Sequence, residues 1–163
     1  MTMRICFVCS GNICRSPMAE VITRAMLDDA GLSDVLVSSA GTGEWHEGEG
    51  ANPPAVRALA DAGYDGSTHR AQGFDRTWFD RLDLVVALDR GHERALRSWA
   101  RTDAERARVV LLRSFDPVAD GDEVADPYGH GPEVFAACLD EVEAACRGLV
   151  DRLVEGGSLT QAG

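Results

Sequence analysis

The fold is decided by the stretch from residue 9 to residue 17, which reads Cys9-Ser10-Gly11-Asn12-Ile13-Cys14-Arg15-Ser16-Pro17. An apolar run from Met3 to Val8 precedes it, as a central parallel strand requires. A helix is expected to open at Ser16-Pro17, because serine suits the N-cap and proline the first turn. Gly31 is expected to end that helix. The stretch is therefore a turn between a buried strand and a helix.

The rest of the chain alternates short apolar runs with helical periodicity, which is typical of a parallel α/β sheet. Further strands are expected at 35–39, 82–88 and 109–112, and further helices at 55–62, 90–99 and 132–154. This order predicts a single-domain α/β fold with a four-stranded parallel sheet and helices on both faces. We expect the domain to occupy residues 1–156 and a flexible tail to occupy 157–163. Ligands bind at the carboxyl ends of such strands, so the turn after Val8 is the first candidate site.

The charge balance limits the function classes. The 163 residues carry a formal net charge of −11, and all 16 basic residues are arginine. This excess of negative charge argues against a nucleic-acid binder and against docking on anionic lipid. No apolar stretch is long enough for a transmembrane helix, and the amino terminus does not match a secretory signal. With five cysteines that lack a framework spacing, we expect a cytoplasmic protein, although leaderless secretion leaves no mark in a sequence.

The turn after the first strand has the composition of an anion-binding loop. Gly11 and Asn12 are the residue types that most readily adopt positive φ, so the loop can turn its N–H groups inward. The following helix adds unpaired N–H groups and a partial positive charge, and Arg15 can donate two parallel hydrogen bonds to an oxyanion. The same field favours the thiolate form of Cys9, and Ser16 can donate a hydrogen bond to it. The sequence predicts a phosphate cradle with a nucleophile at its floor.

Two other interpretations of Cys9 are possible. A free cysteine is often a small buried hydrophobe, but the glycine, asparagine and arginine around Cys9 favour the nucleophile. Cys6 and Cys9 also form a C-x-x-C pattern, which is found in thioredoxins and zinc sites. Positions i and i+3 of a strand face opposite ways, and no second cysteine pair completes a metal site. We therefore expect no metal and no cofactor.

A general acid is needed to protonate the oxygen that leaves a phosphate ester. The candidate is Asp126, in the acidic loop 116–130 before the last helix, where Pro127 stiffens the turn and Tyr128 adds an aromatic ring. Neighbouring negative charges are expected to favour the protonated form of one carboxyl group. Composition alone favours the alternative that this is a solvated acidic loop.

These residues resemble the low-molecular-weight protein tyrosine phosphatases. The resemblance rests on residues 9–17, on Ser38-Ser39-Ala40-Gly41-Thr42 and on Asp126-Pro127-Tyr128, in that order. It covers nearly the whole chain and is strongest to bacterial, especially actinobacterial, members. It implies the flavodoxin-like phosphotyrosine protein phosphatase I fold. It also implies hydrolysis of phosphotyrosine and small aryl phosphates through a cysteinyl-phosphate intermediate, without a metal.

The resemblance further implies a role for each residue of the site. Cys9 is the nucleophile, Arg15 the phosphate clamp, and Asp126 first the general acid and then the general base. The phosphate-binding loop is completed by Ser10, Gly11, Asn12, Ile13, Cys14 and Ser16.

Other residues are implied to shape the site. Ser39 and His69 support the loop through Asn12, and the substrate slot is walled by Ile13, Trp45 and Tyr128. Ile13 favours an aryl ester, because relatives that hydrolyse phosphoarginine tend to have threonine there. Cys14 is implied to protect Cys9 by a reversible disulfide.

Structural roles remain alternatives for three of these side chains. His69 fits a hydrogen-bonded core or surface histidine, Trp45 an aromatic cover for the core edge, and Cys14 a packing residue. Cys138 and Cys146 are expected to be core residues, because their spacing along one helix is too large for a disulfide.

One departure from the family and two rival functions are open to test. The family usually has a second tyrosine after Tyr128, where this chain has Gly129, so one pocket wall should be shorter. An arsenate reductase of the same fold needs resolving cysteines, and residues 88–114 contain none. A catalytically silent phosphotyrosine-binding module is disfavoured because all three catalytic groups are present. Expected partners are tyrosine-phosphorylated proteins and phosphate or other oxyanions, with no nucleic acid and no membrane, and the chain is expected to be a monomer.

Overall fold

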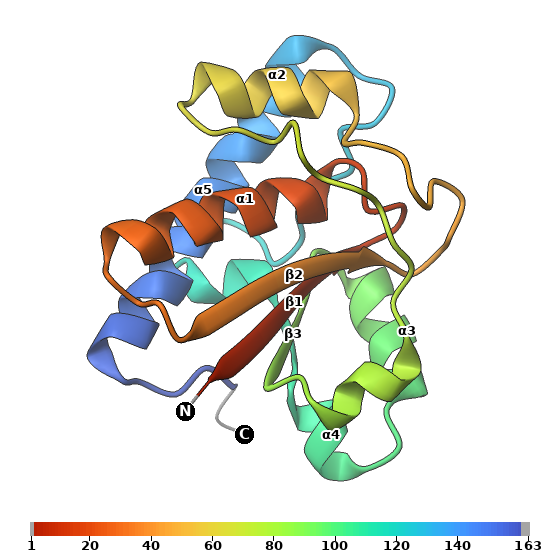
Figure 1. Ribbon diagram of the computed structural model, residues 1–163, viewed down its shortest axis with the longest axis vertical. Coiled ribbons are helices and arrows are strands. Elements are labelled where there is room, and N and C mark those ends of the chain that lie inside the picture. Colours follow the sequence, from red (N-terminus) through yellow and green to blue (C-terminus); the bar gives the residue numbers. More distant parts are fainter. Residues whose placement is uncertain (1, 161–163) are drawn as a thin grey trace.

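The computed structural model describes residues 2–160 and contains one parallel sheet with the strand order β2-β1-β3-β4 (Figure 1). Its strands are β1 (Met3–Cys9), β2 (Val35–Gly41), β3 (Leu84–Ala87) and β4 (Val109–Leu111). β1 pairs with β2 along its whole length, from Met3 opposite Val35 to Cys9 opposite Gly41. The predicted four-stranded parallel sheet is confirmed, and the strand that precedes the candidate loop lies at its centre.

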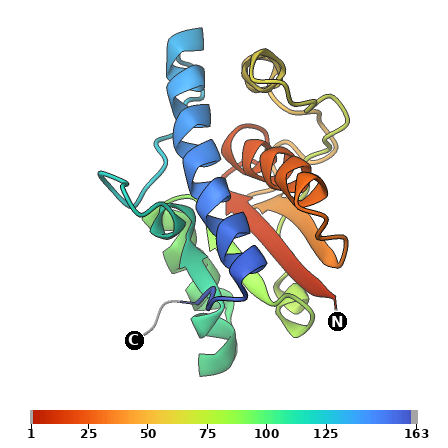
Figure 2. The same cartoon turned by 90° about the vertical axis from the view of Figure 1, so that its left-hand side faces the viewer.

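Helices cover both faces of the sheet, as expected (Figure 2). Helices α1 (Arg15–Asp29), α2 (Pro53–Asp61) and α5 (Pro132–Glu155) contribute to the core on one face. Helix α3 (Arg90–Trp99) contributes to the core on the other face, and α4 (Asp103–Ala107) follows it. Because side chains alternate along β1, Cys9 belongs to the α1 face and Cys6 to the α3 face. The two cysteines therefore do not form a C-x-x-C pair.

The start of α1 differs from the expectation. The N-cap residue is Cys14, no side chain caps the helix, and Ser16 is the second helical residue. The predicted capping role of Ser16 is wrong, because its hydroxyl contacts Cys9 and Asn12 instead. Three short elements were also missed, namely η1 (Arg76–Asp80), α4 and η2 (Leu112–Phe115). Elements of four or five residues are too short to show a hydrophobic period.

The carboxyl-terminal part of the chain is described as far as residue 160. Helix α5 ends at Glu155, and Gly156 follows in a left-handed conformation with a φ of 72°. Of the predicted tail, residues 161–163 lie outside the described part, while Leu159 packs against the core. Within residues 2–160, no helix combines the length and the apolar character needed to cross a bilayer.

Candidate active site

The candidate loop lies at the carboxyl end of β1, at the centre of the sheet. Cys9 is the last residue of β1 and Arg15 the first of α1, and both are buried. Asn12 adopts a left-handed conformation with a φ of 58°, as predicted. Gly11 is absent from the positive-φ residues of the described chain, so that part of the prediction is wrong. A Cβ atom there would lie 2.9 Å from Cδ2 of His46, so the His46 side chain would have to shift.

The end of β2 holds the outer side of this loop. The amide of Thr42 donates to the carbonyl of Cys9 at 2.8 Å, and that of Gly43 donates to the carbonyl of Ser10 at 3.0 Å. Gly41 lies so close that a Cβ atom would be 2.6 Å from the Ser10 carbonyl oxygen. The loop backbone is therefore fixed to β2 by two hydrogen bonds and by a contact that only glycine allows.

Asn12 holds the inner side of the loop. Its Nδ2 group donates to Oγ of Ser16 at 2.8 Å and to Oγ of Ser39 at 2.9 Å, and its Oδ1 accepts from the amide of Gln72 at 3.0 Å. Nε2 of His69 donates to the Asn12 carbonyl at 2.7 Å. The structure thus places Ser39 and His69 against Asn12, where a loop-supporting role requires them. Every polar group of Asn12 is therefore hydrogen-bonded except its backbone N–H.

The direction of these hydrogen bonds determines the environment of Cys9. Because Asn12 donates to both serines, the hydroxyl of Ser39 donates to Oε1 of Glu20 at 2.6 Å. The hydroxyl hydrogen of Ser16 is then available to Sγ of Cys9 at 2.9 Å, with the Ala40 carbonyl farther away at 3.4 Å. Ser16 is therefore placed to stabilise a thiolate.

Cys9 lines one pocket with residues of the loop that follows it. Within residues 2–160, the amides of residues 11–15 donate no hydrogen bond to another backbone group. They lie at the amino terminus of the 15-residue helix α1, whose dipole adds partial positive charge. Unpaired amides at a helix N-terminus form a site for a phosphate or another oxyanion. The loop therefore has the donors expected of a phosphate cradle.

Arg15 is fixed on one side and open on the other. Its Nη1 donates to Oδ2 of Asp89 and to the Val124 carbonyl, each at 2.9 Å. Its side chain is only 4% exposed. Burial would raise the pKa of Asp89, but the hydrogen bond from the His92 amide and the hydrogen bond and positive charge of Arg15 outweigh it, so this pKa lies below its ordinary value. The ionised Asp89 orients the guanidinium, and Nη2 lies beside Ser10 and Asp126.

Asp126 faces this guanidinium from the acidic loop. Its Oδ2 lies 3.9 Å from Nη2 of Arg15, and its Oδ1 accepts from the amide of Tyr128 at 3.1 Å. Val124 anchors the loop, since its amide donates to the Leu88 carbonyl at 2.9 Å while its own carbonyl binds Arg15. The loop brings Asp126 to the mouth of the cradle.

The sequence predicts that neighbouring negative charges surround Asp126, but arginines pair with two of these acids in the structure. Asp122 pairs with Arg90, and Asp120 with Arg113 at 2.7 Å. Arg90, 32 residues away from Asp122 in the sequence, and Arg113, seven residues away from Asp120, therefore neutralise two of the acids of this loop. The charged partner of Asp126 within 4 Å is the cationic Arg15.

Above Cys9 the chain forms a pocket of about 170 Å³. Ile13, Trp45 and Tyr128 line it, as predicted, together with His46, which was not predicted as a site residue. The Trp45 and Tyr128 side chains are exposed, and the rings of His46 and Tyr128 lie 6.5 Å apart. A larger cavity of about 510 Å³ lies elsewhere, next to Ser39 and His69, but it does not include Cys9. The chemistry belongs to the smaller pocket.

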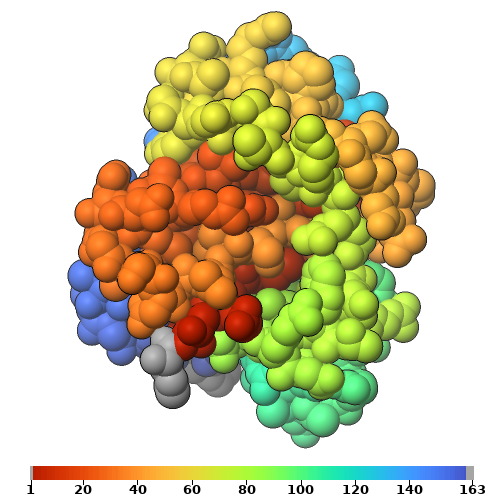
Figure 3. All heavy atoms as spheres, viewed as in Figure 1, coloured from red at the N-terminus to blue at the C-terminus, as the bar shows by residue number. Residues whose placement is uncertain are grey.

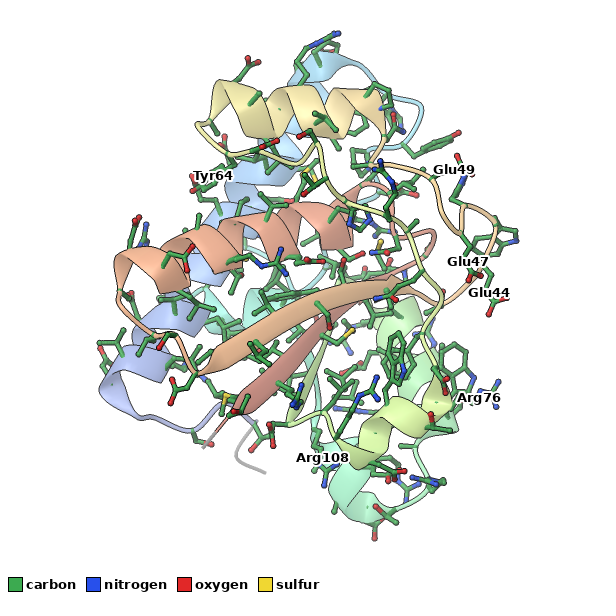
Figure 4. All side chains as sticks on the ribbon, viewed as in Figure 1. Glu44, Glu47, Glu49, Tyr64, Arg76 and Arg108 are labelled. Carbon is green, nitrogen blue, oxygen red and sulfur yellow. The ribbon has the colours of Figure 1, made fainter. Side chains whose placement is uncertain are left out.

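The loop that carries Trp45 lies at one edge of the molecule. In the space-filling view the 41–50 segment is adjacent to the segment that follows residue 63, and two hydrogen bonds of 2.8 Å join Gly48 and Glu49 to Ala71 (Figure 3). Glu44, Glu47 and Glu49 project outward from this loop (Figure 4). Negative charge thus surrounds one side of the entrance, and the cradle is a local positive region in an acidic protein.

Gly129, which stands where the family usually has a second tyrosine, has a left-handed backbone with a φ of 81°. No atom lies within 4 Å of the position that its Cβ would occupy. Space for a larger side chain is therefore present, and the backbone conformation is what favours glycine.

The described cysteines are all free and buried. Cys14 lines the pocket beside Cys9, and burial raises its pKa to about 12, so it is a neutral thiol. Cys138 and Cys146 belong to the core, as expected. Among residues 2–160, no group of three or more histidine, cysteine or acidic side chains is arranged to hold a metal ion.

Four supporting residues were missed in the sequence. They are Glu20, Gln72, Asp89 and His92. A signal existed for two of them, because Asp89 and His92 form a capping box at the start of α3, directly after an apolar strand. No local pattern marks Glu20 or Gln72, whose partners lie far away in the sequence.

Comparison with known proteins assigns this geometry to a family. The sequence profile of the low molecular weight phosphotyrosine protein phosphatases matches residues 4–158. A low molecular weight protein-tyrosine-phosphatase of Streptomyces coelicolor is 59% identical over 153 residues, covering 92% of this chain and 93% of the relative.

Solved structures agree with this match. A protein tyrosine phosphatase of Entamoeba histolytica with Hepes in its active site superposes with a TM-score of 0.90 and 29% identity, over 95% of this chain and 99% of that one. The YwlE arginine phosphatase with a phosphorylated active-site serine superposes with a TM-score of 0.82 and 32% identity, over 93% and 95% of the two chains. The match over nearly all of the sequence, together with the cradle around Cys9, shows that the chain belongs to the low molecular weight phosphotyrosine protein phosphatase family.

Proposed function

We propose that this chain hydrolyses phosphotyrosine in proteins, and small aryl phosphates, through a cysteinyl-phosphate intermediate. One observation supports this most directly: Cys9 lines one pocket with the loop residues whose amides have no backbone partner, and the Ser16 hydroxyl lies 2.9 Å from its Sγ. The proposed domain spans residues 1–156, and the proposed location is the cytoplasm. The proposed partners are tyrosine-phosphorylated proteins and oxyanions. The chain is proposed to act as a monomer.

In the first step the Cys9 thiolate attacks phosphorus in line with the ester oxygen. The loop amides and Arg15 hold the three non-bridging oxygens, and their positive charge stabilises the transition state. The bond from phosphorus to the phenolic oxygen breaks, and Asp126 donates its proton to that oxygen. The products of this step are the free phenol and phosphocysteine.

In the second step Asp126 acts as a base. It accepts a proton from a water molecule whose oxygen attacks phosphorus, while the phosphorus–sulfur bond breaks and its electron pair returns to Cys9. Inorganic phosphate leaves, and Asp126 is again protonated for the next turnover. The Oδ2 atom that faces Arg15 is the one open to the pocket, because Oδ1 accepts from Tyr128.

The pocket favours an aryl ester as substrate. Ile13 is 8% exposed and presents an apolar branch, while the exposed Trp45 and Tyr128 add aromatic surface to the same pocket. A phenyl ring gains contact energy from such walls, whereas a guanidinium group loses hydration there. We therefore expect this chain to hydrolyse phosphoarginine more slowly than phosphotyrosine. The YwlE relative, in contrast, is named an arginine phosphatase.

The proposal is tested with p-nitrophenyl phosphate and a phosphotyrosine peptide. We expect both to be hydrolysed and vanadate to inhibit. The Cys9→Ser substitution should abolish turnover while phosphate still binds to the loop. The Asp126→Ala substitution should slow hydrolysis by about 10²–10⁴-fold, the usual contribution of a general acid. Unchanged activity of the Asp126→Ala protein would show that the acid is misassigned.

The same assay separates the rival functions. A silent phosphotyrosine-binding module would bind the peptide and release no phosphate. An arsenate reductase would reduce arsenate when coupled to thioredoxin and would need a relay of accessible cysteines, whereas all the described cysteines are buried. Phosphate release without arsenate turnover supports the phosphatase.

A further inference from the structure

We infer that Ser10 is a positioning residue for the water molecule that hydrolyses the phosphocysteine, and that His92 sets the direction of its hydroxyl group. This inference rests on the proposed function and assigns a role within its second step. It depends on four groups around the cradle: the side chains of Ser10, His92, Arg15 and Asp126.

The tautomer of His92 follows from its contacts. The side chain is 5% exposed, and burial lowers its pKa to about 4, so the ring carries one proton at neutral pH. The backbone amide of Asp89 donates to Nδ1 at 3.2 Å, which requires an unprotonated Nδ1. Oδ1 of Asp89 also lies 3.1 Å from Nδ1, but it accepts its hydrogen bond from the His92 amide at 3.0 Å. The ring proton therefore belongs to Nε2.

Ser10 consequently has donors on both sides. Nε2 of His92 lies 2.9 Å from Oγ of Ser10 and donates to it. Nη2 of Arg15 donates to the same oxygen at 3.5 Å. A hydroxyl oxygen that accepts twice still has one hydrogen to donate. Neither neighbour can accept it, since arginine has no acceptor and Nε2 is protonated.

The hydroxyl hydrogen of Ser10 is therefore available to a group in the pocket. Ser10 is half-buried and lines the pocket together with Cys9 and Asp126. Oδ2 of Asp126 approaches the same Nη2 atom of Arg15, at 3.9 Å. The Ser10 hydroxyl and the general base thus flank one guanidinium nitrogen at the mouth of the cradle.

A water molecule between these two groups has the hydrogen bonds that the second step needs. It accepts from the Ser10 hydroxyl through one lone pair and donates a proton to Oδ2 of Asp126. Its second lone pair attacks phosphorus, the phosphorus–sulfur bond breaks, and the electron pair returns to Cys9. In the first step the ester oxygen occupies this region and no water is required, so Ser10 acts mainly on hydrolysis.

The test measures the two steps separately. Phosphocysteine is formed from ³²P-labelled p-nitrophenyl phosphate and trapped by acid at increasing times, which gives its rates of formation and decay. Loss of one hydrogen bond in the Ser10→Ala protein should slow decay about tenfold. Formation should stay within about twofold of the parent rate, so the trapped fraction should rise. The Ser10→Thr protein keeps the hydroxyl and should decay at nearly the parent rate.

A matched pair of substitutions tests His92. Asparagine can replace Nδ1 as the acceptor for the Asp89 amide but has no donor near the Nε2 position, whereas glutamine can supply that donor. We expect slower phosphocysteine decay in the His92→Asn protein and partial recovery in the His92→Gln protein. Inhibition by inorganic phosphate should be unchanged within about twofold in the Ser10→Ala protein, because the loop amides and Arg15 remain.

Three results would overturn the inference. Unchanged decay in the Ser10→Ala protein would remove Ser10 from hydrolysis. Equal losses in formation and decay, or weaker phosphate inhibition, would assign Ser10 to loop structure or phosphate binding instead. Absence of any trapped phosphocysteine in the parent protein would contradict the proposed function itself, and so the two failures are distinguishable.

Discussion

The hydroxyl of Ser16 lies 2.9 Å from Sγ of Cys9, and Asn12 determines its direction by donating to the same oxygen. The chain of donors begins at Asn12, and its other branch ends on Glu20 through Ser39. Of the two roles predicted for this hydroxyl, the structure has the hydrogen bond to Sγ of Cys9 and not the helix cap.

Replacement of Ser16 by alanine removes this donor. A hydrogen bond to a charged group contributes about 1.5–3 kcal/mol, so kcat/KM for p-nitrophenyl phosphate should fall about 10- to 100-fold. Alkylation of Cys9 by iodoacetamide at neutral pH should slow as well, since the thiolate loses a stabilising contact. The Ser16→Thr protein keeps the hydroxyl and is the control. Equal alkylation rates in the alanine and parent proteins would exclude the contact.

Replacement of Asp89 by asparagine tests the support of Arg15. The neutral amide keeps the N-cap but loses the ion pair, so we expect kcat/KM to fall and the free energy of unfolding at pH 7 to drop by about 1–3 kcal/mol. Because the pKa of Asp89 is lowered in the folded state, its stabilisation is present above the unfolded pKa of about 3.9 and is lost as pH falls through the folded pKa.

Urea unfolding at a series of pH values measures this effect. The stability difference between the parent and Asp89→Asn proteins should be largest near neutral pH and should shrink in acid. A difference that does not change with pH would mean that the charge of Asp89 contributes nothing.

Replacement of Gly41 by alanine should displace the loop. The new Cβ atom would lie 2.6 Å from the Ser10 carbonyl and 2.8 Å from the Gly43 carbonyl, both of them backbone groups. We expect a loss of stability of about 1–3 kcal/mol and a large loss of activity, because small displacements of catalytic groups are costly. The Gly31→Ala protein is the control, since its Cβ meets no atom within 4 Å, and it should lose stability but keep its activity. Full activity of the Gly41→Ala protein would contradict the assigned loop geometry.

Replacement of Gly129 by tyrosine restores the second tyrosine that the family usually has. The left-handed backbone should cost about 1–2 kcal/mol of stability, without a steric clash. The Gly129→Asn protein should lose less, because asparagine tolerates this conformation. Thermal unfolding of both proteins measures the difference, and a tyrosine variant as stable as the parent would show that the backbone rearranges at little cost.

The fold and the position of the anion-binding loop were predictable because their signals are local, whereas composition alone favoured a solvated acidic loop around Asp126. The apolar strand, the turn and Arg15 are contiguous, and their spacing alone predicts a strand, an anion site and a helix. The contacts of Arg15 were not predictable, since Asp89 and Val124 reach it only through the order of the strands. The pairing of Asp122 with Arg90 was missed for the same reason, whereas Arg113, the partner of Asp120, lies only seven residues away in the sequence.

Some local predictions failed because two functions competed for one side chain. Serine before proline favours an N-cap, yet the hydroxyl of Ser16 has stronger partners in Cys9 and Asn12. Glycine at residue 11 suggested positive φ, but in the structure the close neighbour of this glycine is the His46 side chain. The role of each of these residues depends on neighbours that are close in the folded structure, and a local sequence pattern does not show them.

The two backbone hydrogen bonds of Val124 fix the loop that carries Asp126. Val124 is fully buried and hydrogen-bonded both to the end of β3 through Leu88 and to the phosphate clamp. Asp126, the proposed proton donor, stands only two residues farther along and already lies 3.9 Å from the Arg15 guanidinium. We therefore expect turnover to proceed without a large loop closure, and solvent viscosity should affect product departure more than the arrival of the acid.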